Sequence, residues 1–352
     1  MSEATAAKLA ANTSRERSYF EQQIFARSPF GIFPTALIIF AILFGLYLLF
    51  ASLANIPAVG FRNLLPAFAP GTWPALVISL LICTALAMQR HVRLAELRDF
   101  SAYAAIMKDG TAGACEATAF IPDNARLVAA TLIGLVLGAS ATLFIFLREG
   151  NAVMKSAPLL FAWFLVTITI LSVMFARGVE LTRKADTGFR KLLANDVRID
   201  LLRVDALDVL GRASARAALV WFVISAVICL FFVSGGDTLT AVITLVACAA
   251  MGLWIFTRNM QRVHALIGAA KRTELERVRR EIDSARLSLH ASADAATRVQ
   301  GLLAYEARIA SAPEWPFDQS TLIRFGASAL ILTLPWFGQA VAASVVEHFG
   351  MH

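Results

Sequence analysis

Hydrophobic and polar positions along this chain separate into long blocks instead of alternating every two to four residues. Seven runs, most of them close to 20 residues long, contain no Asp, Glu, Lys, Arg or His. A helix of about 20 apolar residues spans the hydrocarbon core of a bilayer. The pattern therefore predicts an all-α polytopic membrane protein with seven membrane segments. The runs are residues 34–53, 73–89, 127–147, 157–176, 217–234, 238–256 and 326–346.

The first run is predicted to stay in the mature protein. It follows about 30 residues of polar lead and has no small-residue cleavage site close behind it. A secretory signal peptide would have a shorter apolar region and such a site. We therefore expect a retained span at residues 34–53.

The first six runs fall into three predicted transmembrane hairpins, residues 34–89, 127–176 and 217–256. Their first members begin near Pro34, Leu127 and Ala217, about 90 residues apart. A fixed period can mark internal duplication. Residue identity between the three copies is poor, and a hairpin followed by a charged interfacial helix explains the pattern equally well without common ancestry. The duplication is left open.

Lys and Arg gather in alternate connections between the runs. Of the 32 Lys and Arg, 29 lie in residues 1–33, 90–126, 177–216 and 257–325. The positive-inside rule predicts that these four segments, and with them the amino terminus, are cytoplasmic. The carboxyl terminus lies outside if residues 326–346 span the membrane. The net charge of +7 is therefore interpreted as a topology signal and not as a nucleic-acid footprint.

The composition also indicates a membrane protein, and the sequence contains few residues in patterns typical of catalytic or metal sites. The chain is 58% hydrophobic and only 16% charged, against about 25% charged in soluble domains. Cys83, Cys229 and Cys248 fall inside predicted spans and Cys115 in a cytoplasmic connection, none with C-x-x-C spacing. The sequence has no nucleotide-binding glycine loop, metal-spaced histidine pair or G-x-S-x-G motif. We predict no cofactor, no metal site, no catalytic residue and no enzymatic activity.

The segment 257–325 carries a heptad stripe. Its positions alternate in steps of three and four, as in a coiled-coil seam, and we assign cytoplasmic assembly to Leu275, Val278, Ile282 and Leu289. Whether the seam packs on other helices of the same chain or across subunits is left open. The stripe is Leu275, Val278, Ile282, Ala285, Leu289, Ser292, Ala296, Val299 and Leu303.

Residues 195–216 interleave four Asp and four Arg with aliphatic residues. Asp196, Asp200, Asp205 and Asp208 suggest a cation site only if their oxygens converge with fixed geometry. Each has an Arg within four positions, so an amphipathic interfacial helix with internal ion pairs is the preferred interpretation.

The stretch EWPFDQSTLIRF, residues 314–325, joins the heptad helix to the last apolar run. Pro313 and Pro316 should end the helix near Ala312, because proline removes a donor and disfavours helix before it. The remaining residues suit an interface corner and not a catalytic site. Trp315 suits headgroup depth, Asp318 suits a helix cap, and Arg324 suits the cytoplasmic side.

Two further features stand out inside the runs. Gly134 and Gly138 form a G-x-x-x-G motif that allows close helix packing, with a partner helix in this chain or in another copy. The last run, residues 326–346, contains Pro335, which removes a backbone hydrogen bond in mid-span and could kink the helix or make it re-entrant. Thr333, Pro335, Gly338 and Gln339 are the pore or gate candidates.

EWPFDQSTLIRF, the motif LPWFG within the last run, and RIDLLRVDALDVLGR leading into ALVWFVI resemble segments of uncharacterised multi-spanning bacterial inner-membrane proteins. The resemblance covers about the last half of the chain. It implies a bacterial inner-membrane origin and no activity.

The sequence favours an oligomeric, uncoupled channel or pore protein, because no Asp, Glu, Lys, Arg or His lies within a run and ion-coupled transporters usually keep such a residue there. The alternative is a non-catalytic accessory or scaffold subunit of a larger membrane complex. Expected partners are membrane lipids and either further copies of this chain or other membrane subunits, without nucleic acid.

Overall fold

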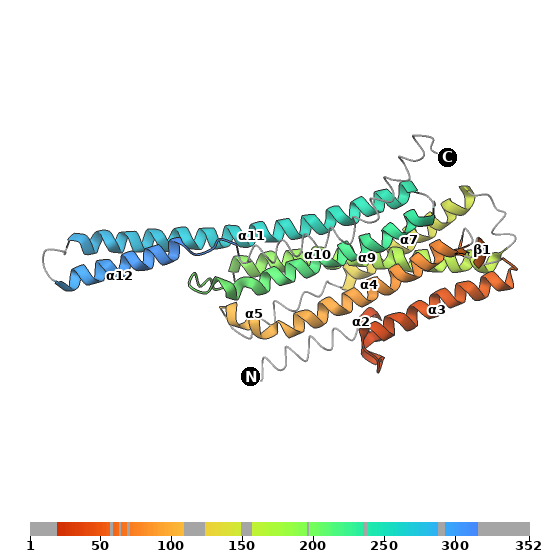
Figure 1. The fold of residues 1–352 in the computed structure, drawn as a ribbon, viewed down its shortest axis with the longest axis horizontal. Coiled ribbons are helices and arrows are strands. Elements are labelled where there is room, and N and C mark those ends of the chain that lie inside the picture. Colours follow the sequence, from red (N-terminus) through yellow and green to blue (C-terminus); the bar gives the residue numbers. More distant parts are fainter. Residues whose placement is uncertain are drawn as a thin grey trace.

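The computed structural model describes residues 20–56, 59–62, 65–68, 71–108, 124–148, 157–195, 197–234, 238–287 and 293–315. This part of the chain is a bundle of long helices with one short β-hairpin, in which β1 (Val59–Arg62) pairs antiparallel with β2 (Leu65–Phe68) (Figure 1). The helices are α2 (Phe20–Arg27), α3 (Ile32–Leu53), α4 (Thr72–Arg98), α5 (Phe100–Ile106), α7 (Asn124–Arg148), α9 (Pro158–Asn195), α10 (Asp208–Ile228), α11 (Thr238–Leu287) and α12 (Ala293–Ala310). Two 3₁₀ helices, η1 (Val204–Leu207) and η2 (Cys229–Ser234), flank α10.

Within the described residues, five helices are long and apolar enough to cross a membrane. They overlap the first five predicted runs, and the candidate spans are Ile32–Leu53, Thr72–Arg98, Ala125–Phe144, Pro158–Leu193 and Asp208–Phe231. The sixth run opens α11, which is not among the five, and residues 326–346 lie outside the described residues. An all-helical membrane class is therefore supported, while the count of seven segments stays a prediction.

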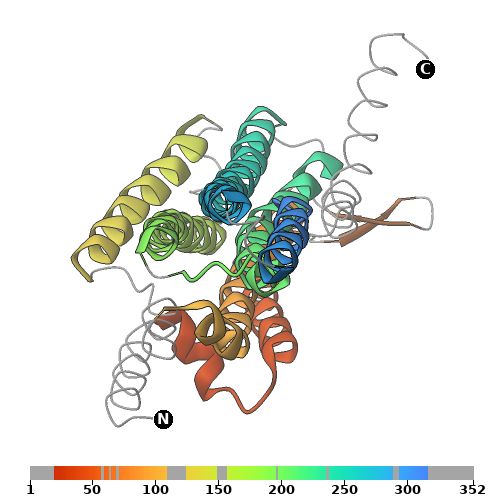
Figure 2. The ribbon, with the colours of Figure 1, turned by 90° about the vertical axis from the view of Figure 1, so that its left-hand side faces the viewer.

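Consecutive long helices pack on each other: α3 on α4, α7 on α9, and α10 on α11. They run side by side along the long axis, with the β-hairpin at one end of the bundle and α5 at the other (Figure 1). Viewed along that axis, α7 lies at the edge of the bundle beside α9 (Figure 2). The arrangement agrees with the predicted pairing of the runs, and their role as transmembrane hairpins stays a prediction.

Aromatic N–H and O–H groups join the helices within the apolar bundle. Trp73 Nε1 donates to the carbonyl of Leu230, at 2.6 Å, and Trp163 Nε1 donates to the carbonyl of Leu43, at 3.0 Å. Each bond links helices far apart in sequence. Tryptophan suits this role because it buries a large apolar ring while its N–H finds an acceptor.

The end of α3 shows how local sequence sets a boundary. Asn55 adopts left-handed backbone, with φ of 55°, which Asn tolerates better than most residues. The Ile56 N–H donates to the Ala51 carbonyl at 3.0 Å, and the Asn55 N–H donates to the Ser52 carbonyl at 3.1 Å. This is a Schellman-type cap, and it turns the chain out of the helix toward β1.

The G-x-x-x-G motif of α7 packs against α9 of the same chain. A Cβ added at Gly134 would lie 2.4 Å from Val173 Cα, and one at Gly138 would lie 2.5 Å from Thr169 Cα. Both distances are far inside van der Waals contact. Glycine at these two positions is what allows the backbones of α7 and α9 to approach closely, as small residues do in membrane helix pairs.

The predicted heptad helix is not continuous. α11 ends at Leu287, and α12 begins at Ala293 and returns beside it. Together residues 271–287 and 293–310 form a helical hairpin, here named the arm, which projects beyond the bundle (Figure 1). α12 ends at Ala310, close to the expected stop near Ala312.

The two halves of the predicted stripe behave differently. Val278 is fully buried and Ile282 is buried on α11, whereas Leu303 on α12 is half exposed and Ile309 is fully buried instead. Because α12 is a separate helix that packs against α11, it docks in its own rotational phase. Two charged contacts hold the arm: Arg279 Nε donates to Glu306 Oε1 at 2.7 Å, and Tyr305 Oη donates to Glu274 Oε1 at 2.9 Å.

The prediction of one amphipathic helix over 195–216 is wrong. Residues 198–203 are not helical, and Val197 forms an isolated antiparallel bridge with Met107. Asp200 Oδ1 accepts the Leu202 N–H at 3.0 Å, a side-chain turn that competes with helix. The chain becomes helical again at η1 and continues as α10.

Replacing Gly134 or Gly138 by Ala should destabilise the protein by about 1–3 kcal/mol through overpacking of α7 on α9. Thermal unfolding in detergent measures this. Gly45→Ala is the matched control, because a Cβ at Gly45 meets nothing within 4 Å and alanine favours helix. Equal melting temperatures for all three variants would contradict the close approach.

Replacing Val278 by Asp should open the arm, because a buried unpaired carboxylate costs about 3 kcal/mol or more. Hydrogen exchange across the arm should speed up while exchange in α4 and α9 stays unchanged. Leu287→Asp is the control on the same helix, since the Leu287 side chain is 89% exposed. Similar exchange in both variants would show that the arm is not held by this seam.

Candidate functional site

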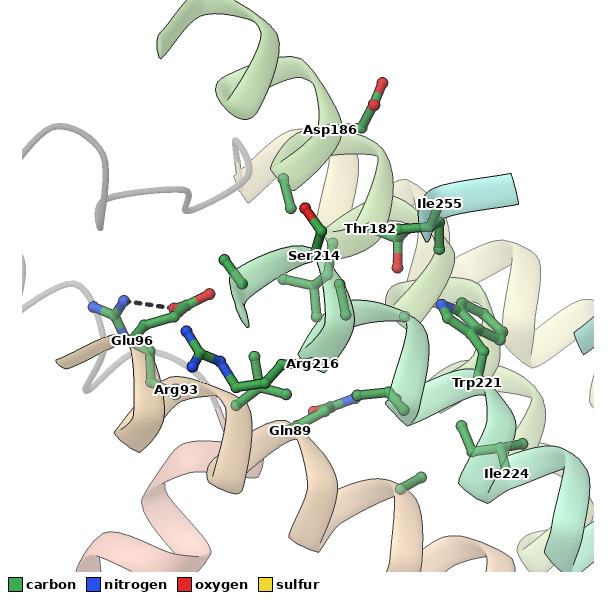
Figure 3. Close-up of a pocket in the computed structure, with 18 of the residues that line it drawn as sticks. Gln89, Arg93, Glu96, Thr182, Asp186, Ser214, Arg216, Trp221, Ile224 and Ile255 are labelled. Atoms are coloured by element: carbon green, nitrogen blue, oxygen red, sulfur yellow. Dashed lines mark hydrogen bonds and ion pairs between the residues drawn. The ribbon is translucent and has the colours of Figure 1, made fainter. Parts of the chain in front are cut away.

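A cavity of about 300 Å³ lies among α4, α9 and α10, with α5 and α11 contributing at its margins (Figure 3). Its volume is at the lower end of the range of about 300–1,000 Å³ for small-molecule pockets. The helices that form it come from all three predicted hairpins, so only the assembled bundle creates it.

One end of the cavity is apolar. Leu81 of α4, Leu171 and Phe175 of α9, and Trp221 and Ile224 of α10 line this end. The rings of Phe175 and Trp221 meet edge to face with centroids 5.7 Å apart. These residues belong to the predicted membrane runs, so the apolar end lies among the candidate spans.

The other end of the cavity is polar. Gln89, Arg93 and Glu96 follow one another on α4 at steps of four and three, which places them on one helix face. Arg216 of α10 faces the same end, whereas Trp221 lies toward the apolar end (Figure 3). Asp186 of α9 completes the charged lining. The cavity is thus amphipathic along its length.

The acids of the polar end are held by arginines. Arg93 Nη1 donates to Glu96 Oε2 at 3.1 Å. Asp186 is paired with Arg262 of α11 at 2.5 Å and with Arg190 at 3.5 Å. These pairs position the carboxylates and reduce their negative charge toward the cavity.

Arg216 is differently placed. Its Nη2 lies 2.7 Å from Asp99 Oδ2, an ion pair by distance in which the two atoms are not aligned as a hydrogen bond. Asp99 also faces Arg212, at 3.6 Å, which in turn pairs with Asp208. The Nε atom of Arg216 is buried and has no acceptor among the residues that the structure describes. A buried donor without a partner is costly, which makes Arg216 the least satisfied group of the site.

Tyr103 of α5 also borders the polar end. Burial, with a further contribution from the nearby Glu96 carboxylate, raises the pKa of Tyr103 well above its usual value. The phenol therefore stays neutral at physiological pH. It can donate a hydrogen bond, and it does not serve as a base there.

The described residues contain no group of three or more His, Cys, Asp or Glu placed to hold a metal ion. With its apolar end and charged end, the arrangement can bind and orient an amphipathic molecule.

The residues predicted as sites fall in separate places. Gly134 and Gly138 lie between α7 and α9, and Val278 and Ile282 lie inside the arm with Leu275 partly buried beside them. None of these lines the cavity. The pore or gate candidates Thr333, Pro335, Gly338 and Gln339, together with Leu289, Pro316, Asp318 and Arg324, lie outside the described residues.

The start of the predicted corner docks on α11. The Trp315 ring stacks on His264 with centroids 4.4 Å apart. Lys271 Nζ donates to the Ala312 carbonyl at 3.0 Å and lies 3.4 Å from Glu314 Oε1. The corner therefore returns the chain from the end of α12 to the middle of α11.

Sequence reasoning missed the cavity and its arginines. The sequence interprets Arg93 as a topology charge, and Arg216 as a topology charge and an ion-pairing residue of segment 195–216, and it assigns neither to a site. A local signal existed in the spacing of Gln89, Arg93 and Glu96, which marks a polar face continuing an apolar helix. Arg216 and Asp99 are more than 100 residues apart in the sequence, so no local pattern predicts that they pair.

No protein-family model matches the chain, and no curated protein or solved structure matches it either.

Replacing Asp99 by Asn should destabilise the protein by about 1–3 kcal/mol, because the Arg216 guanidinium then loses its carboxylate partner. Thermal unfolding in detergent measures the loss. Asp208→Asn is the control, since the Asp208 side chain is 34% exposed against 18% for Asp99, and its ion pair among the described residues is with Arg212. An equal loss of thermal stability in both variants would show that the Asp99 pair stabilises the protein no more than the Asp208 pair does.

Proposed function

We propose that this is a multi-pass protein of a bacterial inner membrane, with a cytoplasmic amino terminus, that binds an amphipathic molecule in the cavity between α4, α9 and α10. The observation that carries the proposal is the division of this cavity into an apolar end and a charged end. Burying a hydrocarbon chain at the apolar end contributes roughly 25 cal/mol per Å² of apolar surface, and the charged end receives a polar headgroup.

The depth of the cavity supports a ligand drawn from the membrane. Leu81 and Trp221 lie within predicted apolar runs, whereas Arg93 follows the run of α4 and Arg216 immediately precedes that of α10. In the proposed topology the apolar end lies in the hydrocarbon layer and the polar end at the cytoplasmic surface. A membrane lipid has the same division at the same depth.

The pore predicted from the sequence receives less support. Its residues lie outside the described part of the chain. Leu81, Leu171 and Trp221 form an apolar end that would oppose a hydrated ion or polar solute. The cavity suits retention of an amphiphile better than passage of a solute, and an uncoupled pore in an oligomer stays a prediction.

The arm supports a second candidate function, that of an accessory or scaffold subunit. It projects beyond the bundle and carries Leu287, whose side chain is 89% exposed, at the end of α11 (Figure 1). A second copy or another membrane subunit could be held there. Loss of a native assembly in the Leu287→Asp variant would favour this candidate. The Val278→Asp variant, measured separately, shows the effect of opening the arm.

Filling the cavity tests the main proposal. Gly178 lines the cavity, and a Cβ added there meets nothing within 4 Å. Gly178→Leu should therefore fold and occupy ligand space. The probe is phosphatidylglycerol with dibrominated acyl chains, added to the full chain in detergent micelles, and the readout is the fluorescence of Trp221, taken as the difference from a Trp221→Phe chain. We expect saturable quenching that weakens at least about fivefold, or 1 kcal/mol, in Gly178→Leu.

Gly45→Leu is the matched control, because a Cβ at Gly45 also meets nothing within 4 Å and this glycine lies on α3, away from the cavity. Trp221 is only 4% exposed, so lipid around the bundle has little direct access to it. Absence of Trp221 quenching in the unmodified chain, or equal quenching in Gly178→Leu and Gly45→Leu, would refute binding in the cavity.

A further inference from the structure

The charge balance at the polar end of the cavity is uneven. Glu96 has Arg93 as a partner at 3.1 Å, and Asp186 has Arg262 and Arg190. Both cavity-lining acids are therefore engaged by arginines. Among the described residues, the ion-pair partner of the Arg216 guanidinium is Asp99, and Asp99 also lies 3.6 Å from Arg212.

The geometry of Arg216 leaves donors for a further acceptor. Its side chain is 16% exposed, and its Nε has no acceptor among the described residues although the atom is buried. Arginine presents its N–H groups as a planar fork that matches two oxygens of one carboxylate or phosphate. In a poorly hydrated site such a charge-assisted pair is stronger than in water.

The position of Arg216 connects this charge to the apolar end. Arg216, Val220 and Ile224 follow one another at steps of four on α10, and all three line the cavity. They form a single face that runs from the charged end to the apolar end. A ligand with an anionic head and a hydrocarbon chain can lie along this face with both parts matched.

We infer that the cavity selects an anionic amphiphile, whose phosphate or carboxylate headgroup binds the Arg216 guanidinium while its chain extends along α10 past Trp221. This inference rests on the proposed binding function and adds the headgroup class and the residue that recognises it. The source is the membrane itself: an acidic lipid rather than a free phosphate ion. Glu96 and Asp186 face the same end and would disfavour a second negative charge.

The test compares two lipids that have the same acyl chains and different headgroups. Dibrominated phosphatidylglycerol and dibrominated phosphatidylcholine are titrated into the full chain in micelles, with the same Trp221 difference signal. We expect the anionic lipid to bind roughly tenfold more tightly. Arg216→Gln should abolish this preference, and Arg216→Lys should restore part of it, because it keeps the charge and loses the fork.

Arg212→Gln is the matched control. Arg212 also faces Asp99 but does not line the cavity, so its loss should leave the headgroup preference intact. If Arg216→Gln folds poorly because Asp99 then keeps only the more distant Arg212, at 3.6 Å, the double variant Arg216→Gln, Asp99→Asn removes both charges and serves the same comparison. Loss of preference in Arg212→Gln as well would overturn a specific role for Arg216.

The remaining outcomes separate the two proposals. Equal quenching of Trp221 by both lipids in the unmodified chain would overturn the headgroup inference and leave amphiphile binding standing. Quenching by neither lipid would overturn amphiphile binding itself. Displacement of the anionic lipid by millimolar inorganic phosphate would overturn the assignment to a membrane lipid and assign Arg216 to a soluble anion.

Discussion

The cost of placing charge in hydrocarbon is the constraint on which the rest of this structure depends. It keeps Asp, Glu, Lys, Arg and His out of the seven apolar runs and places the charged residues in the segments beyond the runs. When the helices pack side by side, the charged segments next to the runs meet. Arg93, Glu96 and Arg216 are then brought to one end of a cavity whose other end is lined by residues of the spans. Its amphipathic character follows directly from this separation.

Polar side chains inside the bundle donate hydrogen bonds to backbone carbonyls. Thr142 and Thr167 donate to backbone carbonyls one turn earlier on their own helices, and Trp73 and Trp163 donate to carbonyls of other helices. These four donors have acceptors within the bundle, so their burial costs little. The buried Nε of Arg216, in contrast, has no acceptor among the described residues, and it lies at a site that we propose to be functional.

The arm shows a limit of periodicity as a guide to tertiary structure. The heptad stripe correctly places Val278 and Ile282 on a buried face. It cannot report that α11 and α12 are two helices packed side by side, because each half of the stripe keeps its own spacing. Once the chain folds back, the phase of α12 is set by packing on α11, and Ile309 becomes buried where Leu303 would be expected. Similarly, the Asp200 turn replaces a helix that hydrophobic patterning alone predicts.

By itself, the sequence determined the helical membrane class, the positions of five apolar helices, the close packing at Gly134 and Gly138, and the end of the last described helix near Ala312. These depend on composition, spacing and proline, which act locally. The tertiary structure alone decided that α9 is the partner of the glycine motif, that the heptad seam closes within the chain, and that Arg216 meets Asp99 beside an amphipathic cavity. Such contacts join residues distant in sequence, and their energies depend on geometry that no local pattern encodes.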